Sequence, residues 1–356
     1  MRKTHSRHFI NEALGVPDNL YETAVSLYRN ILPKLKGFDS SKLKSDKTFK
    51  IGFSGKFRIA DFNFGRIYIT FHFVEDPKEN KPDISGMSVQ TISRKTDDLK
   101  LKYLKYKSII MTVRVDIPEN YDLSEFPKFF ESERNKVIES FSHELKHSYD
   151  AYKKIYDNKY DRALYDAIQG KRFGIWPIDR FIHDIYYISA NESLVRASEV
   201  SAAIRNNEIS QKEFLKFLSN NDTYLNLKRI SEFSYEKLKT QVGEYMHRVN
   251  VLLEHLNYDN LENMSDEEKI DEVLSLVRIN VANWTVEIFY KMLVSEMWEQ
   301  LFGFKGEKER IFKRFQKKQT FDTNEEFFEY YEKLFHFVAN KMIRKIAKLY
   351  AITNKS

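Results

Sequence analysis

The sequence predicts an α+β protein in which a small sheet is followed by many helices. Glycine and proline are scarce, at 11 and 7 of 356 residues, which favours long helices over a loop-rich sandwich. Alternating polar and apolar residues between 57 and 117 predict strands, and apolar residues at helical spacing dominate elsewhere. We therefore divide the chain into an N-terminal helical segment (1–46), a mixed region (47–205) and a helical C-terminal region (206–356).

Composition excludes several classes of site and partner. The chain has no cysteine, so a metal site must use His, Asp or Glu, and a reducing cytoplasm is the expected location. The net charge of +6 is spread over 58 basic and 52 acidic residues, which favours a solvated surface over a nucleic-acid interface. No apolar run is long enough for a signal peptide or a membrane span, so we expect no membrane contact.

The N-terminal half begins with a helix and continues into strands. Apolar residues from Leu20 to Leu32 recur at helical spacing after the start signal at Pro17. Strand patterns flank residues 63–65, where Asn-Phe-Gly predicts a hairpin turn. A further strand is predicted at 108–117. One face of the hairpin's second strand should be formed by Ile67, Ile69, Phe71 and Phe73.

Helices are predicted from Pro118 onward. Apolar residues at helical spacing continue to Leu145 and predict a long helix there. Residues 223–256 form one continuous amphipathic pattern, which predicts a single helix. Two later helices should begin at capping boxes, formed by Ser265 with Glu268 and by Thr323 with Glu326.

The long helix contains the motif His-Glu-Leu-Lys-His at residues 143–147. Positions i and i+4 place the imidazoles of His143 and His147 on one side of a helix, as two zinc ligands require. Glu144 lies beside the first ligand, where it can take a proton from a water bound to the metal. The motif therefore predicts a catalytic zinc site with Glu144 as the general base.

The remaining residues of the helix distinguish a zinc-binding helix with one buried side from a solvated surface helix. Apolar residues follow a different side from the histidines, as a helix with its back in a core requires. That side is formed by Val137, Phe141, Leu145, Ser148 and Tyr152. The alternative is an exposed helix on which Glu139, Glu144 and Lys146 are ordinary solvated charges.

A catalytic zinc needs a third protein ligand, which we look for further along the chain. Our first choice is Glu192, 45 residues after His147, and our second is Glu199 on nearly the same face of one helix. Asp184 or His183 are the remaining options. Glu192 has another explanation, because Ser189-Ala190-Asn191-Glu192 also fits a capping box and Arg196 could be its ion-pair partner.

These residues resemble the gluzincin-type zinc metallopeptidases, through His143-Glu144-Leu145-Lys146-His147 and Asn191-Glu192, over about residues 50–205. The resemblance implies a zincin fold, with a twisted sheet over the motif helix and zinc held by His143, His147 and Glu192. It implies an endopeptidase whose edge strand aligns an extended peptide or protein substrate. That edge strand would be 108–117.

The sequence departs from the family at two places. Family members often have an acidic residue four positions after the ligand glutamate, holding a zinc histidine, whereas this chain has Arg196 there. Glu199 or Asp150 could take that role. The residue that stabilises the oxyanion has no clear signature, and the chemically suitable candidates are Tyr186, Tyr187 and His183.

A structural role is the alternative to catalysis. The C-terminal helices are rich in Phe and Tyr and could form an assembly interface in a larger protein complex, for instance a virion. The composition of the whole chain loosely resembles proteins of tailed phages, which would place it in the host cytoplasm or in the virion. The zincin fold would then be retained without hydrolysis.

Overall fold

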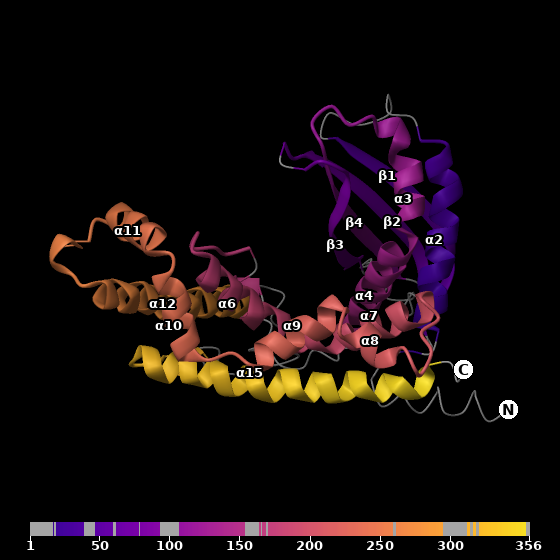
Figure 1. The fold of residues 1–356 in the computed structure, drawn as a ribbon. Helices are drawn as coiled ribbons and strands as arrows, with labels where there is room; N and C mark the ends of the chain where they lie inside the picture. The colour runs from indigo at the N-terminus through magenta and orange to yellow at the C-terminus, as the bar shows by residue number, and fades with distance from the viewer. Residues whose placement is uncertain are drawn as a thin grey trace. The chain divides into compact units, whose positions relative to one another are not determined.

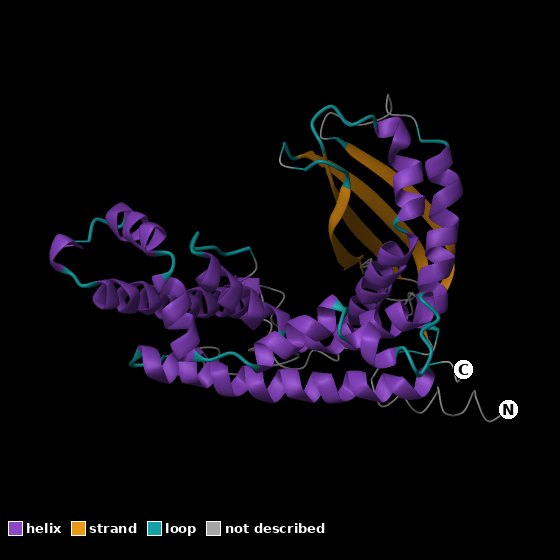
Figure 2. Ribbon diagram, viewed as in Figure 1, coloured by secondary structure: helices purple, strands orange, loops and turns teal. Residues whose placement is uncertain are grey.

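The computed structural model describes residues 17, 19–38, 47–59, 62–77, 79–92, 107–153, 164, 166–168, 170–258, 261–294, 312–313, 316–317 and 320–353. These residues form a mixed α+β protein with one four-stranded sheet and many helices, as the sequence predicts (Figures 1 and 2). Within these ranges, no helix has the length and hydropathy that crossing a bilayer requires.

The chain forms two compact units. The first comprises residues 1–155, 194–223 and 345–356, and the second comprises 156–193 and 224–344. The division falls inside helix α7 (Ala190–Asn206), between Ser193 and Leu194. The division into three regions, ending at 46, 205 and 356, was predicted from local sequence patterns. It remains a prediction.

The sheet of the first unit has the strand order β1-β2-β4-β3. Its strands are β1 (Thr48–Ile59), β2 (Phe62–Glu75), β3 (Asp83–Ile92) and β4 (Lys107–Ile117). Strand β2 pairs with β1 antiparallel and with β4 in parallel, and β3 pairs with β4 antiparallel. The strand predicted at 108–117 matches β4 to within one residue. Strand β3 was not predicted from the sequence.

Two expectations about the strands are wrong. The hairpin turn does not lie at 63–65, because Ile59 already pairs with Phe62 and Asn63 lies within β2. The register of β2 against β4 shifts between Phe64 and Arg66, so Gly65 belongs to a bulge, the other common use of a strand glycine. The strand 108–117 is not an edge either, because β4 is paired on both sides, and β1 and β3 are the outermost of the described strands.

Side chains on one face of the sheet are buried and those on the other are solvated. Ile67, Ile69 and Phe71 are fully buried and Phe73 is 1% exposed, which confirms the predicted core face. On the opposite face Tyr68 is 38% exposed. Alternation with period two places successive side chains on opposite faces, so this sheet needs cover on one side only.

Helices α2 (Leu20–Lys36), α3 (Phe126–Ser132) and α4 (Arg134–Lys153) supply that cover (Figure 1). The ring of Phe71 lies 5.3 Å from that of Phe126 and 5.6 Å from that of Phe130, both edge to face. Such aromatic pairs add roughly 0.5–1.5 kcal/mol beyond their buried area. They fix the helical layer against the sheet and so position α4.

The second unit is helical. It contains α6 (Trp176–Tyr187), α10 (Tyr235–Gly243), α11 (Met246–His255), α12 (Asp266–Val294), most of α9 (Asp222–Ser231) and most of α15 (Asn324–Ala347). The box at Ser265 is complete, because Glu268 N–H donates to Ser265 Oγ at 3.3 Å and Ser265 N–H donates to Glu268 Oε2 at 2.7 Å. At Thr323 the first bond is present, from Glu326 N–H to Thr323 Oγ1 at 3.2 Å, but Glu326 Oε2 accepts from Asp322 N–H. The single helix predicted over 223–256 is wrong, because α9, α10 and α11 share that stretch.

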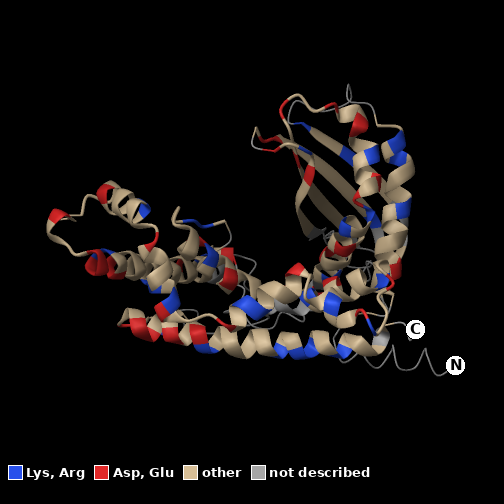
Figure 3. Cartoon of the chain, in the orientation of Figure 1, with Lys and Arg blue, Asp and Glu red and all other residues tan. Residues whose placement is uncertain are grey.

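The core of this unit is aromatic. Phe181 of α6 contacts the rings of Phe328, Tyr331 and Phe335 of α15 at 5.1–5.7 Å. Charges of both signs are interspersed on the helices, and on α15 acidic residues gather toward the N-terminal end and basic ones toward the C-terminal end (Figure 3). Acidic residues near the N-terminus of a helix and basic residues near its C-terminus interact favourably with the helix dipole. The charge pattern of α15 therefore has an explanation that requires no charged partner.

Candidate metal centre

The motif helix α4 is built into the core of the first unit. Val137, Phe141 and Leu145 are fully buried, and Ser148 is 1% exposed, which confirms these four positions of the predicted apolar side. The side chain of Tyr152 lies outside the described residues. Glu144 is 7% exposed and Lys146 is 2% exposed, so the alternative of a solvated surface helix is wrong.

The two imidazoles of α4 converge through their Nε2 atoms. The Nε2 atoms of His143 and His147 lie 3.1 Å apart. Two zinc–nitrogen bonds of 2.0–2.1 Å at a tetrahedral angle would separate the nitrogens by about 3.3 Å. The pair therefore has nearly the spacing that a shared tetrahedral metal requires.

Glu192 lies in the first turn of α7 and is 1% exposed. Its backbone N–H donates to Ser189 Oγ at 3.4 Å, so the serine half of the predicted capping box is present. Its carboxylate oxygen Oε1 accepts a hydrogen bond from the hydroxyl of Tyr186 at 3.0 Å. The cap bond to Ser189 thus uses the backbone N–H of Glu192.

His143, His147 and Glu192 form a group that could bind a metal ion. One ligand atom from each residue lies within 4.8 Å of the others. Two imidazoles and one carboxylate form a donor set that suits zinc and several other divalent transition metals. The residues therefore fit the metal that the motif predicts.

Glu199, the second choice for a ligand, lies on the other side of His143. Its Oε2 is 3.5 Å from Nδ1 of His143, and Arg196 Nη1 donates to the same oxygen at 3.0 Å. Burial opposes ionisation of Glu199, but the bond with His143 and the charge of Arg196 prevail and lower its pKa to about 2. A carboxylate in this position orients the imidazole and raises its basicity toward a metal on Nε2.

The remaining candidates for the site are distributed over α6. Tyr186 is half-buried and its hydroxyl reaches Glu192, whereas Tyr187 is 5% exposed and His183 is exposed. Asp184 is buried but forms a bidentate ion pair with Arg229, at 2.5 and 2.6 Å. Its oxygens are therefore engaged by a guanidinium.

Two features of α4 were missed by the sequence analysis. Lys146 and Asp150 form a buried ion pair, so Asp150 does not serve the histidines. Burial lowers the pKa of Lys146 and raises that of Asp150, and the pairing opposes both shifts. Their i,i+4 spacing was a visible signal. Glu139 is the second feature: it lies one turn before His143, half-buried, and burial together with the charge of Glu199 raises its pKa to about 7.

Comparison of the chain with protein-family models, with curated proteins and with solved structures finds no significant match.

Proposed function

We propose that the protein is a zinc-dependent peptidase of zincin type, an assignment that rests on the convergence of His143, His147 and Glu192 on one point. Two histidines one helical turn apart and a carboxylate from a second helix are the ligand set of a catalytic zinc in this class. The 3.1 Å separation of the two Nε2 atoms supports the assignment, since the pair is poised for a common ion.

Glu144 is the general base of the proposed reaction. It follows His143 on α4 and is 7% exposed, so its carboxylate is held in a largely water-excluded place. It would take a proton from the attacking water and deliver it to the amine that leaves. A zinc ion at the three ligands supplies Lewis-acid polarisation of the carbonyl and a lowered water pKa.

Tyr186 is our preferred oxyanion stabiliser among the three candidates. Its hydroxyl is already 3.0 Å from the proposed ligand Glu192, whereas the side chain of His183 is exposed and its Nδ1 lies 3.9 Å from Asp184. Removing one hydrogen-bond donor to a developing oxyanion typically costs about 2.7–4 kcal/mol of transition-state stabilisation.

An extended peptide would pair with the free edge of β3. This strand is the sheet edge that packs against α4, and it is antiparallel to its only neighbour among the described strands, β4. Main-chain hydrogen bonds to such an edge hold a peptide extended with little demand on its sequence. This assignment replaces 108–117, which has no free edge.

The test is to compare wild type with Glu144→Gln after purification from medium containing zinc. We expect about one zinc per chain in both proteins by elemental analysis, and hydrolysis of an unstructured protein such as casein by the wild type only. His143→Ala is the matched variant that should lose zinc as well. A protein without zinc would refute the proposal, and a zinc-loaded wild type inactive on all peptides would favour the assembly role.

A further inference from the structure

A cavity of about 520 Å³ lies in the first unit next to the candidate metal centre. Its walls come from α4, α7, α8 (Phe214–Leu218) and the segment 220–223. Glu199 belongs to its lining and lies 3.5 Å from His143, so the cavity and the metal centre share a wall. The volume falls within the range of ligand pockets, roughly 300–1,000 Å³.

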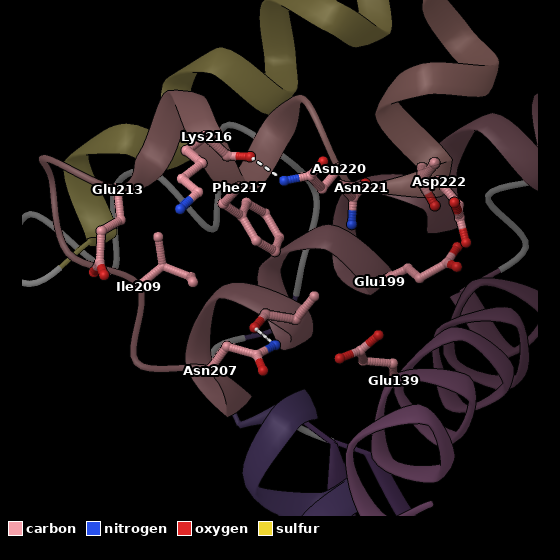
Figure 4. Close-up of a pocket in the computed structure, with 12 residues that line it drawn as sticks. Glu139, Glu199, Asn207, Ile209, Glu213, Lys216, Phe217, Asn220, Asn221 and Asp222 are labelled. Atoms are coloured by element: carbon pink, nitrogen blue, oxygen red, sulfur yellow. Dashed lines mark hydrogen bonds between the residues drawn. The ribbon is translucent and has the colours of Figure 1, made fainter.

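The lining combines an apolar wall with an excess of negative charge. Four carboxylates face one lysine, Lys216. In Figure 4 Glu139, Glu199 and Asp222 lie toward one end, and the ring of Phe217 lies between them and Lys216. An acidic or nucleic-acid ligand would be repelled by this lining, whereas a long cation with an aliphatic stem would match it.

Among the carboxylates at this end, Asp222 is exposed to solvent and Glu139 is half-buried. Glu199 has Arg196 as an ion-pair partner. Glu139 accepts only a weak hydrogen bond from Asn206 Nδ2, at 3.4 Å, and no Lys or Arg among the described residues pairs with it. A half-buried carboxylate without a cation is costly, as its pKa of about 7 reflects, and a ligand that brings one removes the cost.

We infer that this cavity receives a basic side chain, lysine or arginine, of a bound peptide substrate. The inference rests on the proposed function and deepens it by naming the substrate class. The ammonium or guanidinium lies between Glu139 and Glu199, and the aliphatic stem lies against Phe217 and Ala203. Glu139 is thus a specificity-determining residue, and takes no part in the hydrolysis.

The test measures binding to zinc-loaded Glu144→Gln protein, which separates recognition from turnover. The probes are alanine hexapeptides with capped ends in which one lysine is placed at each position in turn, and matched peptides with norleucine, which keeps the stem but lacks the charge. In one register we expect the dissociation constant by calorimetry to be at least tenfold lower for lysine than for norleucine.

Substitutions then locate the preference. Adding Glu139→Gln should reduce the ratio of the norleucine to the lysine dissociation constant to threefold or less. Glu131→Gln, at an exposed residue of α3, should leave that ratio unchanged. Asn207→Lys is the second variant, for use if Glu139→Gln fails to fold. It adds an ammonium to the cavity wall from an exposed position, so it should also lower the preference for lysine.

Equal affinity for both peptides in every register, or no binding of either, would overturn the inference. Calcium binding that Glu139→Gln abolishes, without a lysine preference, would assign the cavity to an inorganic cation and overturn it as well. The zinc content and casein hydrolysis of the wild type are measured separately. A failure confined to the peptide pair therefore leaves the peptidase proposal intact, and a protein without zinc refutes both.

Discussion

The carboxylate of Glu199 lies 3.5 Å from Nδ1 of His143, on the opposite side of the ring from the nitrogen that faces His147. A carboxylate on one nitrogen of an imidazole fixes the tautomer in which the other nitrogen has a lone pair for a metal. Arg196 Nη1 forms an ion pair with the same carboxylate at 3.0 Å, so two residues of α7 adjoin this side of His143.

Replacing Glu199 by glutamine should weaken metal binding without removing a ligand. We expect zinc affinity, measured by competition with a chromophoric chelator, to fall about tenfold to a hundredfold, the usual effect of losing such a partner. Glu131→Gln is the control, since that residue is exposed and belongs to α3, which carries none of the proposed ligands. An unchanged zinc affinity for Glu199→Gln would show that the contact does not orient His143.

Glu139 should make the folded state less stable as pH rises. Its folded pKa of about 7 lies above the ordinary 4.5, since burial disfavours the charge and Glu199 faces it from α7. The folded chain therefore keeps a proton that the unfolded chain releases between pH 4.5 and 7. The contribution of Glu139 to the free energy of unfolding is fully present below pH 4.5 and is lost as pH rises through 7. The total loss is at most about 3 kcal/mol.

Glu139→Gln is the variant that checks this contribution. Its free energy of unfolding in urea, relative to wild type, should increase between pH 4.5 and pH 8, because the amide cannot ionise. Subtracting the two proteins removes the titration of groups that they share. A difference that stays constant over this range would contradict the raised pKa.

Removing one member of the buried pair of Lys146 and Asp150 should destabilise the fold more than removing both. Lys146→Met leaves a carboxylate with no exposed surface unpaired and should cost about 3–5 kcal/mol of unfolding free energy. Lys146→Met with Asp150→Leu removes both charges and should recover most of that loss. Urea unfolding of the two variants gives the comparison, and equal stability of single and double variants would argue against the pair.

The ion pair of Asp184 with Arg229 should stabilise the helical unit in the same way. Asp184 is 2% exposed and Arg229 holds both of its oxygens. Arg229→Met should lower the free energy of unfolding by about 3 kcal/mol, and adding Asp184→Asn should restore at least half. Lys333→Met, which removes an exposed i,i+4 pair with Glu329, is the control and should have no measurable effect.

Local pattern was sufficient for much of the fold and for part of the site. The period-two alternation at Ile67 to Phe73 predicted the core face of β2, and the capping boxes at Ser265 and Thr323 placed two helix starts. The spacing of His143 and His147 fixed their side of α4, because i and i+4 share a face in any helix. These features depend on backbone geometry over a few residues, which the sequence determines directly.

Other features required the tertiary structure. No local signal showed that β3 would lie outside β4 and leave 108–117 in the interior of the sheet, because strand order is decided by long-range pairing. The pattern over 223–256 hid the breaks between α9, α10 and α11, since an amphipathic period can continue through a turn. The sequence ranked Glu192 before Glu199 as the third ligand, but only the tertiary structure separates their surroundings: Glu192 groups with the two histidines, and Glu199 lies 3.5 Å from Nδ1 of His143.

The sequence by itself determined that two imidazoles and a glutamate would lie on one helix with an apolar back. Only the tertiary structure decided which carboxylates meet them, because α4 and α7 are joined by more than 30 residues of chain whose course no short-range rule prescribes. In the structure His143, His147 and Glu192 form a group that could bind a metal ion, and Glu199 lies 3.5 Å from Nδ1 of His143. The packing also leaves Glu139 facing a cavity without a cation, a property that depends on burial and neighbours and on no pattern in the sequence.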